Sequence, residues 1–199
     1  MKRQDVLEIF ARYRGDAPAI TGPSFGGRML FATDHRPATI YNMEFGYSAA
    51  MFLGLALCLP NEHVFVIEGD GSMLAGVGVL TTIARYRPRN LVIIVIDNGA
   101  YVTTGSIPTA TAGVADLVVM ARGAGIEHAW RAKDAATFEQ YMQRAVAEEG
   151  PFFITVDVDQ EDMASVGRSR AMPFDIVESS IRFRRTLEER GLVPPIWAV

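Results

Sequence analysis

The 199-residue chain has one cysteine and three histidines, so few side chains are available for a disulfide or a zinc site. Cys58 lies in the apolar run 56–59, and we expect it to be a small core residue. His63 and His128 fall in apolar, strand-like runs and are expected to be structural, whereas a substrate role for His35 stays open. No spacing of His and Cys is typical of zinc ligands. A chain of this length buries enough surface to fold without a disulfide or a structural metal.

The sequence also lacks net positive charge and long apolar runs. Its formal charge is −4 and its pI is about 5.4, which argues against a general role in binding nucleic acid. No apolar stretch reaches the length needed to span a bilayer, and residues 1–5 lead directly into an amphipathic helix rather than a targeting leader. We therefore expect a cytoplasmic protein that binds neither nucleic acid nor membrane.

Two apolar runs in the middle of the chain predict the centre of a sheet. Residues 63–67 and 91–96 are rich in β-branched and aromatic side chains and do not alternate in polarity. Strands of this kind are typical of a parallel sheet that is covered on both faces. Residues 72–86 can form the helix that connects them, ending before Pro88. The three segments together form a βαβ unit of ordinary length.

The same alternation continues along the chain. Periodicity predicts helices at 4–13, 25–31, 46–59, 114–122 and 134–148, and strands at 19–21, 39–41, 126–130 and 152–156. The helix at 46–59 has no polar face, which is typical of a buried helix. We therefore expect residues 1–199 to form a single domain of the α/β class, a three-layer sandwich around a mostly parallel, doubly wound sheet.

The pattern changes after Asp159. Residues 160–171 carry small and charged side chains and are expected to form a loop. Residues 173–191 predict a C-terminal helical extension with Pro near its start and Gly at its end. This helix has apolar residues at Ile176, Val177, Ile181 and Leu187. They predict that it packs against the domain or lies at an interface.

Polar residues follow both central strands. Asp70 comes after the first strand and Asn98 after the second, so neighbouring strands would bring the two side chains into one crevice. A carboxylate and an amide oxygen suit Mg²⁺, which takes its other ligands from phosphates and water. Ser72 begins the following helix, whose free N–H groups form a natural phosphate seat, although Ser72 can also act as a plain helix cap. This combination predicts a Mg²⁺–diphosphate site.

The segment Gly69-Asp70-Gly71, with 27 residues between Asp70 and Asn98, resembles the thiamine-diphosphate motif. This resemblance implies that the Asp70 and Asn98 side chains and the Ala100 carbonyl bind Mg²⁺. It further implies that thiamine diphosphate contacts residues of both motif segments, namely Gly69, Asp70, Gly71, Ser72, Asn98, Ala100 and Tyr101. The chain is thus similar to the pyrophosphate-binding domain of thiamine-diphosphate-dependent enzymes.

Residues 41–46 resemble the family segment Y-x-G-S-M-G. By that match, the Met43 carbonyl accepts the N–H of the aminopyrimidine ring, and Phe45 is the apolar wedge beneath the bent cofactor. Glu44 would be either a substrate-facing residue or a surface acid. Further upstream, two interpretations of Gly22 and Ser24 are equally open. They either contact the diphosphate or form a simple turn.

The resemblance covers about residues 19–158 and is nearest to the small (beta) subunit of sulfopyruvate and phosphonopyruvate decarboxylases. The segments that carry it are 21–24, 36–37, 97–101 and 104–109. Two segments depart from that pattern. Glu44 and Phe45 stand where the family usually has Ser and Met, and residues 104–109 read T-G-S-I-P-T where it usually has T-G-G-Q-P-T.

The resemblance implies a lyase that decarboxylates a small 2-oxo acid to an aldehyde through a C2-bound enamine. In the family, a glutamate from a separate pyrimidine-binding domain activates the cofactor. We expect the chain to be too short for that domain, so an alpha-type partner subunit would supply it in a hetero-oligomer. The alternatives are a carboligase or lyase of the acetolactate-synthase type and a non-catalytic scaffolding subunit. A Rossmann nucleotide-binding module is also considered, but the third glycine of its motif is missing.

Overall fold

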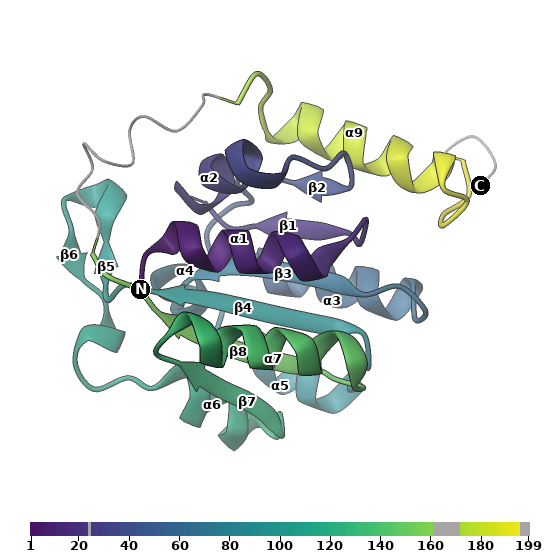
Figure 1. Ribbon diagram of the computed structural model, residues 1–199. Helices are drawn as coiled ribbons and strands as arrows, with labels where there is room; N and C mark the ends of the chain where they lie inside the picture. The colour runs from purple at the N-terminus through teal and green to yellow at the C-terminus, as the bar shows by residue number, and fades with distance from the viewer. Residues whose placement is uncertain (24, 161–171, 196–199) are drawn as a thin grey trace.

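The computed structural model describes residues 1–23, 25–160 and 172–195 (Figure 1). Ser24 and most of the predicted loop at 160–171 therefore lie outside the described residues. A six-stranded sheet forms the middle of the structure, in the order β2-β1-β3-β4-β8-β7, and every pair of neighbours is parallel. The strands are β1 (Ala19–Thr21), β2 (Thr39–Ile40), β3 (Val64–Gly69), β4 (Leu91–Asp97), β7 (His128–Ala132) and β8 (Phe152–Asp157). The predicted parallel sheet is confirmed.

Helices cover both faces of this sheet, and Figure 1 shows α1 and α7 in front of it with α3 and α5 behind. One apolar layer contains side chains of α1 (Arg3–Arg14), α2 (Phe25–Asp34) and α7 (Ala135–Ala147). The other contains side chains of α3 (Ser48–Cys58), α4 (Asp70–Ala75), α5 (Val79–Tyr86), α6 (Leu117–Ala124) and α9 (Ile176–Glu189). The three-layer α/β architecture is thus as predicted.

The central strands read as continuous apolar runs because both of their faces are buried. On β3, Phe65 and Ile67 pack in the layer of α1, whereas Val64 and Val66 pack in the layer of α3. Successive side chains point to opposite sides of a strand, so a strand between two helical layers needs apolar residues at every position.

Strands β3 and β4 lie side by side, with Gly69 paired to Ile96. This register places Asp70 and Asp97, the residues that follow this pair on the two strands, at the same edge of the sheet. The carboxyl ends of parallel strands share one edge, which is where ligands collect in open α/β sheets. The neighbouring positions predicted for Asp70 and Asn98 are therefore present in the structure.

The connection between β3 and β4 differs from the single predicted helix at 72–86. It forms two helices, α4 and α5, separated at residues 76–78. A Cβ added at Gly76 would lie 2.3 Å from the carbonyl oxygen of Gly46, so the backbones of these two residues are in contact. Only glycine permits that approach, and glycine is also a weak helix former.

The prediction of a fully buried helix at 46–59 is wrong for one face of α3. Phe52 and Ala56 are buried, but Met51 is 44 % and Leu57 45 % exposed. Cys58 is exposed as well, which contradicts its predicted place in the core. Only one side of α3 faces the sheet, so its apolar character on the other side does not lead to burial.

Two other helices refine the predicted boundaries. Helix α6 begins at Leu117 because the Asp116 side chain accepts hydrogen bonds from the N–H groups of Val118 and Val119. Helix α9 buries Leu187 but leaves Val177 64 % and Ile181 48 % exposed, so only part of its apolar surface packs against the rest of the chain.

A short hairpin follows β4 and was not predicted. It consists of β5 (Ala100–Tyr101) and β6 (Ile107–Pro108), with 3₁₀ turns η1 (Val102–Thr104) between them and η2 (Ala110–Ala112) after them. This hairpin brings residues 109–111 back to the edge of the sheet. Among the residues that the structure describes, no helix has the length and apolar character needed to cross a membrane.

Candidate functional site

A cavity of about 310 Å³ opens at the carboxyl ends of β1, β3 and β4. Most of the residues predicted to bind the cofactor line it, namely Gly22, Glu44, Phe45, Gly69, Asp70, Gly71, Ser72, Asn98, Ala100 and Tyr101. The structure therefore brings together residues from four separate segments of the chain. Met43 does not line the cavity, and Ser24 lies outside the described residues.

Asp70 is the first residue of α4 and is only 2 % exposed. Its Oδ2 accepts hydrogen bonds from the hydroxyl groups of Thr109, at 2.5 Å, and Thr111, at 2.9 Å. Both threonines bind the same oxygen, so the two hydrogen bonds fix the orientation of the carboxylate. The sequence analysis did not predict that Thr109 and Thr111 would contact Asp70. The threonine-rich stretch 103–111 was the sequence feature that could have pointed to them.

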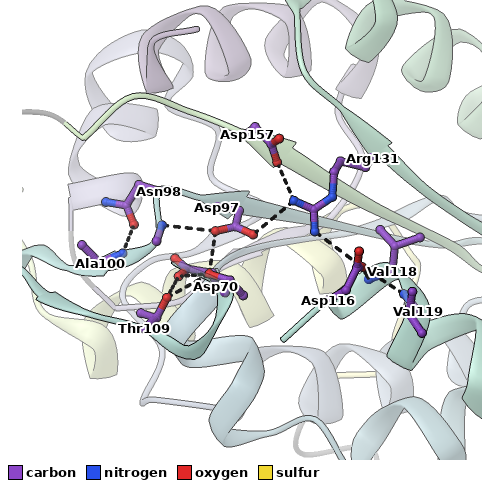
Figure 2. Close-up of polar contacts among 12 residues, drawn as sticks. Asp70, Asp97, Asn98, Ala100, Thr109, Asp116, Val118, Val119, Arg131 and Asp157 are labelled. Atoms are coloured by element: carbon purple, nitrogen blue, oxygen red, sulfur yellow. Dashed lines mark hydrogen bonds and ion pairs between the residues drawn. The ribbon is translucent and has the colours of Figure 1, made fainter. Parts of the chain in front are cut away.

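Asn98 follows β4 and is held by a tight turn. Its Oδ1 accepts a hydrogen bond from the backbone N–H of Ala100 at 3.2 Å. Gly99 adopts a φ of +66°, a conformation that favours glycine, and its carbonyl accepts the N–H of Thr109 at 2.9 Å. The turn therefore places Asn98 and the Thr109 hydroxyl at the same edge of the sheet (Figure 2).

Asp97 connects this edge to a charged cluster (Figure 2). Its Oδ1 lies 2.8 Å from the Thr111 hydroxyl oxygen, whose single proton is shared between Asp97 and Asp70, and its Oδ2 lies 4.0 Å from Nη1 of Arg131. The pKa of Asp97 is raised, mainly because the carboxyl group is buried, and the hydrogen bond with Thr111 opposes this only in part. Arg131 also pairs with Asp157 at 3.0 Å and with Asp116 at 3.5 Å. Thr111 thus links Asp70, through Asp97, to a network of charges behind the cavity.

Tyr101 and Phe45 form the aromatic side of the cavity. A Cβ added at Gly71 would lie 2.1 Å from Cε1 of Tyr101, so the tyrosine ring rests directly on the backbone of Gly71. The rings of Phe45 and Tyr101 have centroids 6.0 Å apart. Phe45 is 45 % exposed, and Glu44 beside it is exposed too, so both lie at the rim rather than at the bottom.

Glu68 lies deeper in the cavity and was not anticipated as a site residue. It is 2 % exposed, and burial raises the pKa of its carboxyl group. A Cβ added at Gly22 would lie 2.0 Å from its Oε2, so Gly22 is small because Glu68 occupies the space above it. An acid at the end of an otherwise apolar strand, directly before Gly69, is the sequence signal that could have identified it.

Ser72 and Met43 have structural contacts of their own. The hydroxyl oxygen of Ser72 accepts the N–H of Gly46 at 2.9 Å, which ties the 41–46 segment to α4. The N–H of Met43 donates to the carbonyl of Thr21 at 2.8 Å, and its side chain packs against the core. His35 does not line the cavity; its Nδ1 lies 2.9 Å from the Tyr41 hydroxyl in an aromatic cluster.

The residues present fit Mg²⁺ and a diphosphate. The donors at the strand ends are hard oxygen ligands, a carboxylate from Asp70 and an amide from Asn98. Within the described part of the chain, no group of three or more His, Cys, Asp or Glu side chains forms a metal cluster. A site with few protein ligands suits Mg²⁺ when phosphates and water complete its shell. The first residues of α4, Asp70 and Gly71, line the same cavity, and the first N–H groups of a helix have no acceptor within the helix, so they suit a phosphate.

Comparison with known families identifies the family to which the chain belongs. Residues 31–156, more than half of the chain, match the family model described as "Thiamine pyrophosphate enzyme, C-terminal TPP binding domain". The chain belongs to the thiamine pyrophosphate enzymes. The matched range contains the 41–46 segment, Asp70 and Asn98, and the predicted family resemblance is confirmed.

Two similar proteins of this family have named activities. The chain is 35 % identical over 159 residues to the sulfopyruvate decarboxylase subunit beta of Methanothermobacter thermautotrophicus, covering 79 % of this chain and 82 % of that subunit. It is 28 % identical over 193 residues to the phosphonopyruvate decarboxylase of Streptomyces viridochromogenes, covering 96 % of this chain. The chain spans about half of that second protein, 47 % of its length.

Solved structures of other enzymes share the fold. The thiamine diphosphate-dependent 4-hydroxybenzoylformate decarboxylase of Rhodococcus jostii RHA1 matches with a TM-score of 0.70 at 20 % identity, over 81 % of this chain and 33 % of that one. The 2-oxoglutarate:ferredoxin oxidoreductase of Magnetococcus marinus matches with a TM-score of 0.65 at 18 % identity, over 92 % of this chain and 74 % of that one. At these identities the likeness supports the fold alone.

Proposed function

We propose that this chain is the thiamine-diphosphate- and Mg²⁺-binding subunit of a two-subunit decarboxylase that acts on a small 2-oxo acid. The observation that carries the proposal is the position of Asp70 and Asn98, on adjacent strand ends, in one cavity at the start of α4. The chain as a whole would act as one pyrophosphate-binding domain, with α9 as its C-terminal extension.

In this proposal the chain anchors the cofactor. The Asp70 and Asn98 side chains and the Ala100 carbonyl hold Mg²⁺, and Thr109 and Thr111 keep the Asp70 carboxylate in the orientation that the metal needs. The backbone at Gly71 and Ser72 binds the diphosphate at the start of α4. Gly69 leaves space for its close approach, and Gly22 and Ser24 are further proposed contacts. When bound, thiamine diphosphate supplies the carbanion chemistry that removes CO₂ from a 2-oxo acid.

The 41–46 segment would orient the organic part of the cofactor. The Met43 carbonyl accepts the aminopyrimidine N–H, and Phe45, with the ring of Tyr101 near it, supports the bent conformation. Glu44 at the rim would face the substrate. The named relatives support a 2-oxo acid with an acidic tail, because sulfopyruvate and phosphonopyruvate both carry one.

The other half of the active site would come from an alpha-type partner with the pyrimidine-binding domain and the activating glutamate. The chain covers 82 % of a relative named as a beta subunit, but 47 % of a decarboxylase named without a subunit. Exposed apolar side chains lie beside the cavity, including Phe45 at 45 %, Tyr47 at 64 % and Ile107 at 59 % exposed. This rim is where we propose that the partner docks.

Calorimetric titration of the full chain with thiamine diphosphate and Mg²⁺ tests the anchor. We expect binding that requires Mg²⁺ and that Asp70→Ala abolishes, while the surface variant Asp16→Ala binds like the wild type. The carboxylate of Asp16 is 79 % exposed and pairs with Arg36, another surface residue, so its loss tests for general effects of removing a charge. Unchanged binding in Asp70→Ala would contradict the proposed site.

Turnover is tested by co-expression with the candidate partner subunit and assay of 2-oxo acids with sulfonate, phosphonate and methyl tails. We expect CO₂ and an aldehyde from the complex and little or no turnover from this chain alone. Robust activity of the isolated chain would contradict the two-subunit proposal. Accumulation of a carbon–carbon coupling product in place of the aldehyde would favour a carboligase of the acetolactate-synthase type.

A further inference from the structure

Arg3 lines the candidate cofactor cavity from the helical layer opposite α4. It is the first residue of α1 and is 7 % exposed. Figure 1 shows the N-terminal end of α1 close to the arrowhead of β4, where the cavity opens. The backbone there is held in place, because the N–H of Asp159, just beyond β8, donates to the carbonyl of Met1 at 2.9 Å. Arg3 is therefore a fixed part of the cavity wall.

The position of Arg3 differs from that of the diphosphate seat. The cavity residues Ile67 and Ile96 belong to the apolar layer of α1, whereas α4 and Ser72 lie on the other side of the sheet. A ligand anchored at Asp70 and the start of α4 would extend over the ends of β3 and β4 before it meets Arg3. Arg3 thus borders the cavity from the helical layer opposite to that of α4.

The cavity is lined by more acidic than basic side chains. Its acidic side chains are Glu44, Glu68 and Asp70, and within the described ranges Arg3 is its one basic side chain. The charges on Mg²⁺ do not neutralise a diphosphate together with a buried carboxylate, and unbalanced buried charge is costly. A guanidinium stays protonated and has five N–H donors, so it can bind an anion while it also contacts protein groups.

We propose that Arg3 is an anion-binding residue of this cavity, and that it contacts an anionic oxygen group of the bound ligand. This inference rests on the proposed function, which supplies two sources of such a group. One is the diphosphate of the cofactor, and the other is the acidic tail of the 2-oxo acid. Planar, charge-assisted contacts of arginine with phosphate or carboxylate oxygens are the chemistry that the two sources share.

The experiment titrates the full chain with three probes in the presence of Mg²⁺: thiamine diphosphate, inorganic pyrophosphate and phosphonopyruvate. The variants are Arg3→Met, which removes the charge, and Arg3→Lys, which keeps it. The matched control is Arg12→Met on the same helix, because Arg12 is half exposed and pairs with Glu139 away from the cavity. Thermal unfolding of every variant identifies any that fails to fold, and Arg3→Lys then provides the comparison.

If the inference holds, Arg3→Met weakens binding of at least one probe by about 10- to 100-fold, with a smaller loss in Arg3→Lys and none in Arg12→Met. A loss for pyrophosphate assigns Arg3 to the diphosphate, and a loss for phosphonopyruvate alone assigns it to the substrate. Wild-type affinity of folded Arg3→Met for all three probes overturns the inference and leaves the proposed function intact. Failure of the wild type to bind thiamine diphosphate overturns the proposed function itself.

Discussion

The hydroxyl of Thr109 donates a hydrogen bond of 2.5 Å to Oδ2 of Asp70, although Asp70 begins α4 and Thr109 follows β6, 39 positions later in the chain. Asp70 is the residue on which the proposed metal site depends, and its carboxylate is almost completely buried. Thr109, which follows the hairpin after β4, therefore helps to fix the orientation of the Asp70 carboxylate after β3.

Thr109→Val keeps the shape of this side chain and removes its hydroxyl. We expect Mg²⁺-dependent binding of thiamine diphosphate to weaken by about 10- to 100-fold, because groups that orient a metal ligand have effects of this size. The free energy of unfolding should fall by about 1–3 kcal/mol, since a buried acceptor loses a donor. Calorimetry and chemical denaturation measure the two effects, and Thr186→Val, at a half-buried position of α9, is the control. Equal affinity in both variants would refute the role given to Thr109.

Gly71→Ala places a methyl group against the ring of Tyr101, 2.1 Å from Cε1. We expect a loss of about 1–3 kcal/mol in unfolding free energy, the usual cost of overpacking. Gly54→Ala is the matched control, because nothing lies within 4 Å of an added Cβ in that exposed turn of α3. It should stabilise the protein by about 0.5–1 kcal/mol through helix propensity. The double variant Gly71→Ala/Tyr101→Ala should recover stability, and a failure to do so would mean that the ring is not the obstacle.

Arg131→Met leaves Asp97, Asp116 and Asp157 without their shared cation. Because Arg131 is only 27 % exposed, we expect a loss of about 1–3 kcal/mol, more than a surface pair gives. The comparison is Arg89→Met, whose pair with Glu149 is largely exposed and should be worth about 0.5 kcal/mol or less. Urea denaturation at neutral pH measures both, and similar losses in the two variants would show that the cluster adds nothing to an ordinary surface pair.

Glu68→Gln tests the buried acid of the cavity through its pH dependence. Burial raises the pKa of Glu68, so its contribution to stability is present in acid and is lost as the pH rises through the folded-state pKa. A glutamine amide does not ionise, so it avoids the free-energy cost of burying a charged carboxylate. Glu68→Gln should therefore be more stable than the wild type at pH 8, and the difference in stability should shrink in acid. Thermal unfolding across pH 4–8 measures the trend. Glu148→Gln should behave in the opposite sense, because Arg144 lowers the pKa of Glu148.

Cys58 gives a simple check of the surface of α3. The thiol is exposed at the end of this helix, so a thiol reagent should modify it in the folded protein without denaturant. Absorbance of the released chromophore, compared between native and unfolded protein, measures the reaction. Modification that begins only after unfolding would place the thiol in the core.

The strand ends that carry Asp70 and Asn98 were predictable because both depend on local patterns. Buried parallel strands are recognised by continuous apolar runs, and polar residues after them point to the shared edge. Thr111 was not predictable in this way. Its contact with Asp70 requires the hairpin after β4 to turn back, through positive φ values at Gly99, Gly105 and Ser106. Apolar periodicity carries no information about such turns.

Helix α3 and the break after α4 show a second limit of sequence reasoning. The lack of a polar face at 46–59 predicts burial, yet Met51 and Leu57 are exposed because nothing in the described part of the chain covers that face of the helix. The break at 76–78 arises from contact with Gly46, which is 30 positions earlier in the chain. Both features depend on which segments meet in space, and a single sequence records this only indirectly.

The contact between Gly46 and Gly76 also determines which changes the chain can tolerate during evolution or engineering. It fixes the backbone of the 41–46 segment to α4, together with the hydrogen bond from Gly46 to Ser72. The side chains of Glu44, Phe45 and Tyr47 project from this fixed backbone and are exposed. These three exposed side chains can therefore be varied without moving the backbone to which they are attached, whereas a side chain added at Gly76 would collide with the Gly46 carbonyl.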